Sequence, residues 1–100
     1  MLHTINKSPF EKNSLESCLR LAKEGDDILL IEDAVYAATA ATDISAQMEE
    51  AVRKYGVYAL GPDLSSRGIG QSKLLEGIEV VDYAGFVDLT VKNETVQSWL

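Results

Sequence analysis

Four short apolar segments, with helical sequence between them, constrain the fold of this chain more than any other feature. They lie at residues 2–5, 28–31, 57–60 and 78–81, and the stretch Ile28–Ile31 is apolar at every position. Strands that are apolar throughout are typical of a parallel sheet covered on both faces. Because helical patterns alternate with them, we expect one α/β domain over residues 1–100, a small doubly wound parallel sheet with helices on both faces.

The helical segments carry recognisable start and stop signals. Residues 15, 18, 19 and 22 are apolar at helical spacing, and Gly25 is a natural stop after them. Two start signals compete, one at Ser8-Pro9 and one at Asn13-Ser14, and we favour the later start with residues 6–12 as a loop. Further helices are expected over 34–40 with Asp33 as the cap, over 44–55, within 61–68 and over 83–92. Residues 96–100 are expected to form an edge strand or a packed tail.

Composition excludes several classes of function. The chain has 9 Lys and Arg against 16 Asp and Glu, a net charge of −7. Because the basic residues are also scattered, we expect no direct binding to nucleic acid. The single cysteine excludes an intrachain disulfide and cannot by itself build a structural zinc site. No uncharged run approaches the roughly 20 residues of a membrane span, and the first residues do not resemble a signal peptide. We therefore expect a cytoplasmic protein that needs neither a metal nor a cofactor.

The usual catalytic and nucleotide-binding motifs are missing. No glycine-rich phosphate loop follows the first strand, and Gly68-Ile69-Gly70 is too short to count as one. His3 lies inside the first predicted strand, where a histidine with satisfied hydrogen bonds is expected rather than a catalytic one. Glu32 and Asp33 end a strand at the edge where such sheets bind ligands, although a helix cap at Asp33 explains them equally well.

Cys18 is the one residue with reactive potential, and two interpretations of it stay open. Helical spacing puts it on the apolar face with Leu15, Leu19 and Ala22, where a free cysteine commonly packs as a small hydrophobe. A reactive thiol would need partial exposure and nearby positive charge. Arg20 and Lys23 are close in sequence, but neither shares the helix face of Cys18.

The pattern of the whole chain resembles the DsrH/TusB family of sulfur-relay subunits. The resemblance rests on blocks that follow in order over essentially all 100 residues. They are Leu2-His3-Thr4 with Ser8-Pro9, Glu24-Gly25-Asp26, Glu32-Asp33-Ala34-Val35-Tyr36-Ala37-Ala38, Tyr58-Ala59-Leu60-Gly61-Pro62-Asp63-Leu64 with Arg67-Gly68, Val81-Asp82-Tyr83-Ala84-Gly85-Phe86-Val87-Asp88-Leu89-Thr90, and Trp99.

This resemblance implies a DsrE/F/H-like fold and a set of protein partners. Family members assemble with homologous DsrE/TusD-like and DsrF/TusC-like subunits into a heterohexamer, and they pass persulfide sulfur to a DsrC/TusE-like acceptor. In one branch the sulfur belongs to intracellular sulfur oxidation, and in the other it becomes the 2-thio group of a tRNA wobble uridine. The principal transfer cysteine of such complexes lies on the DsrE/TusD-like subunit.

Within the family, the setting of Cys18 resembles the DsrH branch, so we expect a DsrH-like subunit of sulfur oxidation with Cys18 as the candidate persulfide carrier. The alternatives are a TusB-like subunit for tRNA 2-thiolation and a non-catalytic subunit that shapes either complex. In each case the chain acts within a sulfur-transfer complex rather than as a stand-alone enzyme. A small-ligand-binding domain outside the family is the weakest hypothesis.

A chain of this size is also expected to bury apolar surface against other subunits and to self-associate without its partners. The candidates for that surface are the helix that carries Ile44, Met48 and Val52 and the residues around Tyr83–Phe86.

Overall fold

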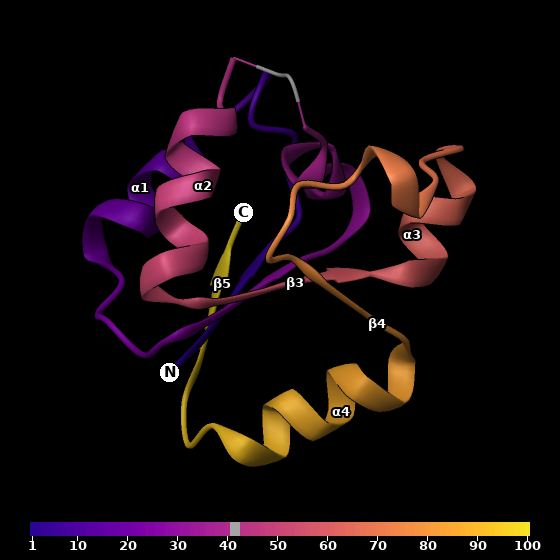
Figure 1. Cartoon of the computed structure of the whole chain (residues 1–100). Coiled ribbons are helices and arrows are strands. Elements are labelled where there is room, and N and C mark those ends of the chain that lie inside the picture. The colour runs from indigo at the N-terminus through magenta and orange to yellow at the C-terminus, as the bar shows by residue number, and fades with distance from the viewer. Residues whose placement is uncertain (41–42) are drawn as a thin grey trace.

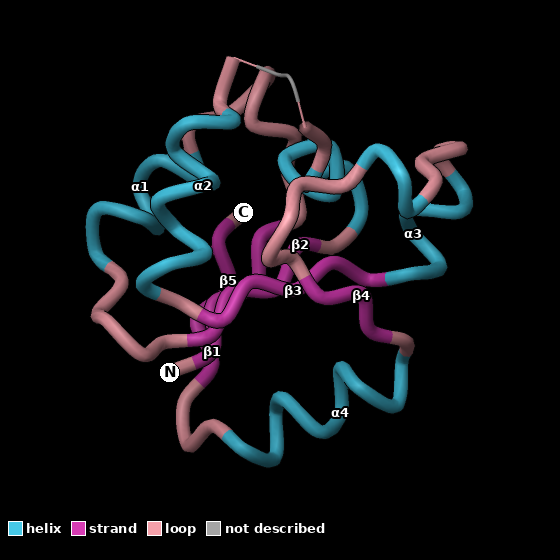
Figure 2. The backbone as a smooth tube through the Cα atoms, in the orientation of Figure 1, coloured by secondary structure: helices cyan, strands magenta, loops and turns pink. Residues whose placement is uncertain are grey.

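The computed structural model describes residues 1–40 and 43–100, and its centre is a five-stranded sheet in which all neighbouring strands are parallel. The strand order is β4-β3-β2-β1-β5. The expected doubly wound parallel sheet is therefore confirmed, and Figures 1 and 2 show it between two layers of helices. The strands are β1 (Leu2–Ile5), β2 (Asp27–Leu30), β3 (Gly56–Leu60), β4 (Glu79–Val81) and β5 (Val96–Trp99).

Most helices lie on one side of the sheet, and a single helix lies on the other (Figure 1). The first four strands follow one another across the sheet, and the chain then returns to place β5 beside β1. The connection that makes this return is α4, which crosses the opposite face of the sheet. The helices are α1 (Ser14–Leu21), η1 (Glu32–Ala38), α2 (Ser45–Lys54), α3 (Gly61–Ser66), η2 (Gln71–Lys73) and α4 (Tyr83–Lys92). Among the residues described, no helix is both long and apolar enough to cross a bilayer.

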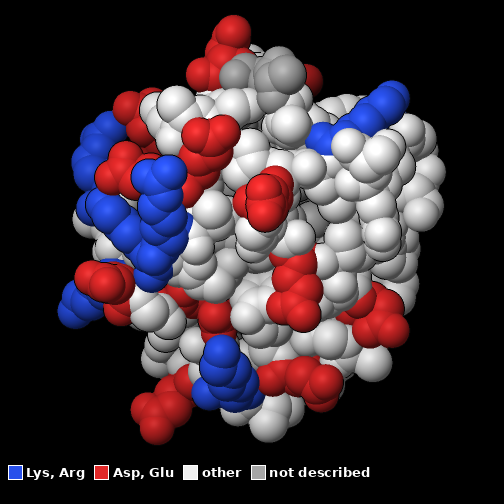
Figure 3. All heavy atoms as spheres, in the orientation of Figure 1, with Lys and Arg blue, Asp and Glu red and all other residues white. Residues whose placement is uncertain are grey.

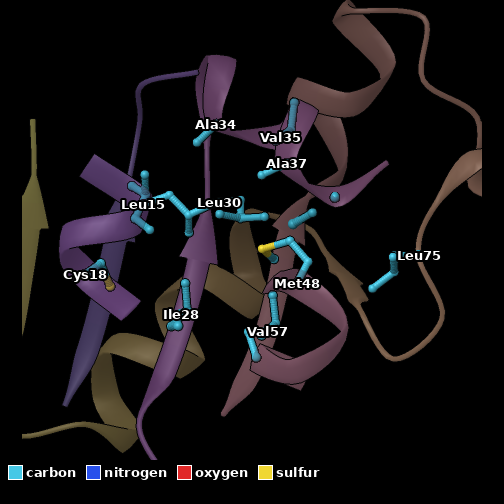
Figure 4. Packing of buried hydrophobic residues seen from close by; sticks show 14 of the residues in the cluster. Leu15, Cys18, Ile28, Leu30, Ala34, Val35, Ala37, Met48, Val57 and Leu75 are labelled. Atoms are coloured by element: carbon cyan, nitrogen blue, oxygen red, sulfur yellow. The ribbon is translucent and has the colours of Figure 1, made fainter. Parts of the chain in front are cut away.

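The larger core fills the side of the sheet that carries α1, η1 and α2. It joins Ile28 and Leu30 of β2 to Leu15 of α1 and Met48 of α2, as Figure 4 shows. Alternate residues of β2 point to this side, whereas Leu29 points to the other side and packs with Leu2 and Leu89. Both faces of β2 are buried, which explains why this strand is apolar at nearly every position.

The helix α4 is anchored to the second face at both ends. At its start, the Asp82 carboxylate accepts a hydrogen bond from the Gly85 amide at 2.8 Å and so caps the helix. At its end, the buried carboxylate of Asp27 accepts a hydrogen bond from Asn93 Nδ2 at 3.0 Å and lies 3.2 Å from Lys92 Nζ. The predicted helix over 83–92 is confirmed at both boundaries.

Local features of the sequence explain most of the remaining boundaries. The helix α1 begins at Ser14, the later of the two start signals. The earlier signal makes a turn instead, in which the Phe10 amide donates to Ser8 Oγ at 3.2 Å. The segment 96–100 supplies an edge strand, paired in parallel with β1.

Two expectations were wrong. Asp33 does not cap an α-helix over 34–40. The backbone instead forms the 3₁₀ helix η1, and Asp33 lies in its first turn without a side-chain cap bond. Met48, one of the residues expected to form an apolar surface on the helix over 44–55, is not available to other subunits. Met48 is fully buried in the chain's own core, and Ile44 and Val52 are half-buried against it.

Candidate functional site

Cys18 lies in the second turn of α1, on the side of the helix that faces the sheet. Its side chain is fully buried, in the cluster that also contains Leu15 and Ile28. Figure 4 shows Cys18 on α1, near Leu15 of the same helix, with Ile28 on the neighbouring strand β2. The helical spacing that placed Cys18 among apolar residues therefore describes its surroundings correctly.

This environment suppresses the reactivity of the thiol. Burial raises the pKa of Cys18, the negative charge of Asp26 adds to this effect, and together they bring the pKa to about 12. A thiol with such a pKa is almost entirely protonated at neutral pH. Because the thiolate is the nucleophile, Cys18 is then unreactive. Arg20 does not counter this effect, since its guanidinium pairs with Glu16 at 3.2 Å on the exposed side of α1.

Two hollows adjoin on the surface above α1 and α2, but neither reaches the thiol. One, of about 240 Å³, is lined by Leu19 and Tyr55 together with charged side chains of the two helices. The second, of about 340 Å³, continues from it toward Phe10 and Ile44. Cys18 lines neither hollow. The structure therefore shows no route through these hollows by which a sulfur donor reaches Cys18.

His3 forms the centre of a polar group on the same side of the sheet. Its Nδ1 lies 3.1 Å from the indole Nε1 of Trp99, and its Nε2 lies 2.9 Å from Oδ2 of Asp26. An indole N–H can only donate, so Nδ1 is the acceptor, and Nε2 carries the proton that is donated to Asp26. Both ring nitrogens are occupied, as expected for a histidine with satisfied hydrogen bonds, and His3 has no free nitrogen with which to activate Cys18.

Asp26 gathers several donors into this group. Burial would raise its pKa, but hydrogen bonds from His3 and the Lys23 amide and the charge of the Met1 ammonium outweigh burial, and the pKa falls to about 2. The Lys23 amide donates at 3.0 Å, and the ammonium nitrogen of Met1 lies 3.3 Å from Oδ1. The carboxylate is therefore ionised at neutral pH and joins β1 to the residues just before β2, while Trp99 of β5 contacts the other ring nitrogen of His3.

Sequence reasoning missed Asp26 and Trp99 as the partners of His3. The parallel register of β1 and β5 places Trp99 opposite Ile5, so the indole reaches His3 from the far end of the chain. No local motif signals a pair separated by 96 residues. Only the strand order could have indicated it.

The carboxyl edge of the sheet carries a second polar group, around Glu32 and Asp33. Glu32 has a positive φ of 51°, and its amide donates to Oδ2 of Asp63 at 2.6 Å. Asp33 pairs with Arg67, whose Nη2 lies 2.8 Å from Oδ1. This hydrogen bond and this ion pair link η1 to α3 and to the residue that follows it. The carboxylates end their strand where expected, but their contacts are within the protein.

Away from the point between β1 and β5 where the strand order reverses, the carboxyl ends of β3 and β4 form another part of this sheet edge. A hollow of about 400 Å³ lies there, lined by Gly61, Val80, Val81, Asp82 and Gly85. The lining contains no basic side chain, and Asp82 is already used as the cap of α4. This crevice therefore offers nothing that favours a phosphate group.

On the face of the molecule shown in Figure 3, the surface charge gives no indication of a nucleic-acid site. In the view of Figure 3, the Lys and Arg side chains gather mainly over α1 and α2, where acidic side chains are interspersed with them. Two pairs of these side chains form ion pairs, each within a single helix: Glu16–Arg20 in α1 and Glu50–Lys54 in α2. Within residues 1–40 and 43–100, no three His, Cys, Asp or Glu side chains are grouped so that they could hold a metal ion.

Comparisons with known structures confirm the class of protein, a small α/β domain built on an open parallel sheet. The structure superposes on the crystal structure of the ychN protein from E. coli with a TM-score of 0.82, at 22% identity and over 97% of both chains. It superposes on MTH1491 from Methanobacterium thermoautotrophicum with a TM-score of 0.76, at 17% identity over 97% of this chain and 95% of that one. At these identities the likeness concerns the fold alone.

Sequence comparisons give the family. The profile of the family described as DsrH like protein matches residues 7–96. The chain is 39% identical to Protein TusB of Shigella flexneri and 38% identical to Protein TusB of Escherichia coli K12, in both cases over 99% of this chain and the whole of the relative. The chain belongs to the DsrH-like family, as its sequence pattern indicated.

Proposed function

We propose that this chain is a TusB-like subunit of the persulfide relay that supplies the 2-thio group of a tRNA wobble uridine. The support is its similarity to proteins named TusB over their full length. This similarity favours the tRNA alternative over the role in intracellular sulfur oxidation that the setting of Cys18 had suggested.

Within the relay, we propose a structural role for the chain. In a persulfide transfer, an acceptor thiolate attacks the outer sulfur of the donor persulfide, a new S–S bond forms, the old one breaks, and the donor leaves as a thiolate. That step needs an accessible sulfur of low pKa. The observation that carries our proposal is the burial of Cys18, which encloses its sulfur and raises the pKa of the thiol to about 12.

The partners proposed for it are those that the family resemblance implies. They are homologous TusD-like and TusC-like subunits, of which the TusD-like one carries the transfer cysteine, and a TusE-like acceptor. Persulfide exchange between thiols requires no metal or organic cofactor. The net charge of −7 disfavours contact with the phosphate backbone of tRNA, so we propose that this subunit does not bind the tRNA itself.

The proposal is tested by measuring 2-thiouridine in tRNA by mass spectrometry in cells that lack the chain. We expect the modification to be lost, and to be restored equally by the wild-type chain and by Cys18→Ala, which keeps the position apolar. Unchanged 2-thiouridine in the deletion strain would refute the tRNA branch. Failure of Cys18→Ala at a normal level of folded protein would refute the structural role and make Cys18 a carrier.

A measurement on the purified protein examines Cys18 directly. The native chain is mixed with a persulfidated donor or with a bulky alkylating reagent, and its mass is recorded. We expect no gain of one sulfur atom and no alkylation until the chain is unfolded. A gain of one sulfur that a reductant reverses would establish Cys18 as a persulfide carrier.

A further inference from the structure

The buried ring of His3 lies between two neighbours that favour opposite charge states of that ring. Its Nε2 lies 2.9 Å from Oδ2 of Asp26, and its Nδ1 lies 3.1 Å from the indole Nε1 of Trp99. An ionised carboxylate favours a positively charged ring. An indole N–H can only donate, so it favours a neutral ring whose Nδ1 still has its lone pair. The hydrogen bond from Trp99 therefore exists only while His3 is uncharged.

We propose that His3 acts as a proton-operated latch for β5: when its Nδ1 takes up a proton from solvent, the ring releases the Trp99 indole and loosens the strand that carries it. In the charged ring both nitrogens carry hydrogen, so the ring N–H and the indole N–H then oppose each other. The ring centroids lie 6.2 Å apart, and the indole presents its N–H edge to Nδ1. The edge of an aromatic ring is positive and therefore repels a cation.

The strand β5 depends on Trp99 for its attachment to the core. Residues 96–98 are exposed, whereas Trp99 is partly buried and packs against the larger core cluster. The strand lies at the edge of the sheet and pairs with β1 alone. A side-chain bond between Thr4 and Ser98, 3.3 Å long, adds little to that pairing. Loss of the indole contact thus removes the main side-chain anchor of an edge strand.

The groups around the ring leave it free to respond to pH. Histidine ordinarily changes its charge between pH 5 and 8. In that range Asp26 stays ionised, because its pKa is about 2, and Cys18, which faces the same group from α1, stays a neutral thiol. The Met1 ammonium lies 3.3 Å from the other oxygen of Asp26. The residues paired with His3 in the adjoining strands are the uncharged Ile28 and Gln97, and the side chains of Lys23 and Glu24 are exposed.

The latch does not depend on the proposed role in the sulfur relay, and it is tested by NMR on the whole chain, whose one histidine and one tryptophan give unambiguous signals. The ring nitrogens of His3, the indole proton and the backbone amides are followed as pH is lowered. Protection from hydrogen exchange is expressed relative to an unfolded peptide at the same pH. We expect the protection of the indole and of β5 to fall at least about tenfold as the ring is protonated, while amides between β2 and β3 keep theirs.

Two variants should shift this transition in opposite directions. Asp26→Asn removes the charge that stabilises the protonated ring, so release of the indole should require a lower pH. Trp99→Phe removes the donor that holds the ring neutral, so His3 should be protonated at a higher pH than in the wild type. The matched control is His3→Gln, because an amide can accept from the indole and donate to Asp26 without titrating. Its indole should not respond to pH.

The wild-type titration decides the question even where a variant fails to fold. A proton on Nδ1 instead of Nε2 above neutral pH would overturn the proposal, as would an indole whose protection stays constant while His3 is protonated. A ring that stays neutral until the whole sheet unfolds would also refute the latch. So would a pH response in His3→Gln as large as that of the wild type.

Discussion

Replacing Asp26 by asparagine should reveal how strongly the polar group around His3 stabilises the fold. The carboxylate accepts hydrogen bonds from the His3 ring and the Lys23 amide and lies beside the Met1 ammonium. These contacts lower the pKa of Asp26 from its usual 3.8 to about 2, in spite of its burial. At about 1.4 kcal/mol per pKa unit, the ionised carboxylate contributes about 2 kcal/mol to the free energy of unfolding at neutral pH.

The pH dependence has a definite sign. Because the pKa is lower in the folded state, the contribution is complete above the usual pKa of 3.8 and is lost as pH falls toward about 2. Wild-type protein should therefore be about 2 kcal/mol more stable than Asp26→Asn at neutral pH. The difference should shrink steadily as the solution is acidified below about pH 4.

The assay is urea unfolding, followed by circular dichroism at several pH values, with free energies from linear extrapolation. Asp43→Asn is the matched control, because Asp43 is exposed and the substitution removes the same charge. It should change stability little at any pH. Equal stability of Asp26→Asn and wild type at neutral pH would refute this reasoning, as would a difference that persists unchanged in acid.

Three further substitutions should lower the free energy of unfolding, measured in the same way. Cys18→Ser places a hydroxyl in the apolar core and should cost about 1–3 kcal/mol, whereas an accessible cysteine would tolerate serine. Trp99→Phe removes the indole N–H that donates a hydrogen bond to the His3 ring. It should cost about 1–3 kcal/mol, because the buried ring nitrogen of His3 then has no donor. A smaller loss would mean that water replaces the indole. Gly56→Ala directs a methyl group into the carboxylate of Asp27 and should cost about 1–3 kcal/mol. An unchanged free energy of unfolding would show that the carboxylate moves aside freely.

The fold could be predicted because the signals for its strands and helices lie within short stretches of the sequence. The apolar stretch Ile28–Ile31 indicated a strand buried on both faces, and Ser14 and Gly25 bounded the first helix within a few residues. The apolar spacing around Cys18 predicted a buried thiol equally well. What a pattern could not supply was whether the thiol opens onto a surface, since that depends on how α2 and the sheet pack over α1.

The polar contacts could not be predicted, because they depend on strand order. His3, Asp26 and Trp99 come from three separate parts of the chain, and only the placement of β5 beside β1 brings them together. In the same way, Met48 has the spacing of an interface residue, but the covering of α2 by the sheet makes it a core residue. Periodicity reports which face of a helix is apolar and says nothing about what covers that face.

The position of β5 also has a consequence for the order of events in folding. Thr4 pairs with Leu29, 25 residues along the chain, and with Ser98, 94 residues along. For a flexible chain, closing the longer loop costs about 1 kcal/mol more than closing the shorter one. The β5 strand is thus expected to join the sheet after the folding barrier has been crossed, so that substitutions in it accelerate unfolding and leave the rate of refolding nearly unchanged.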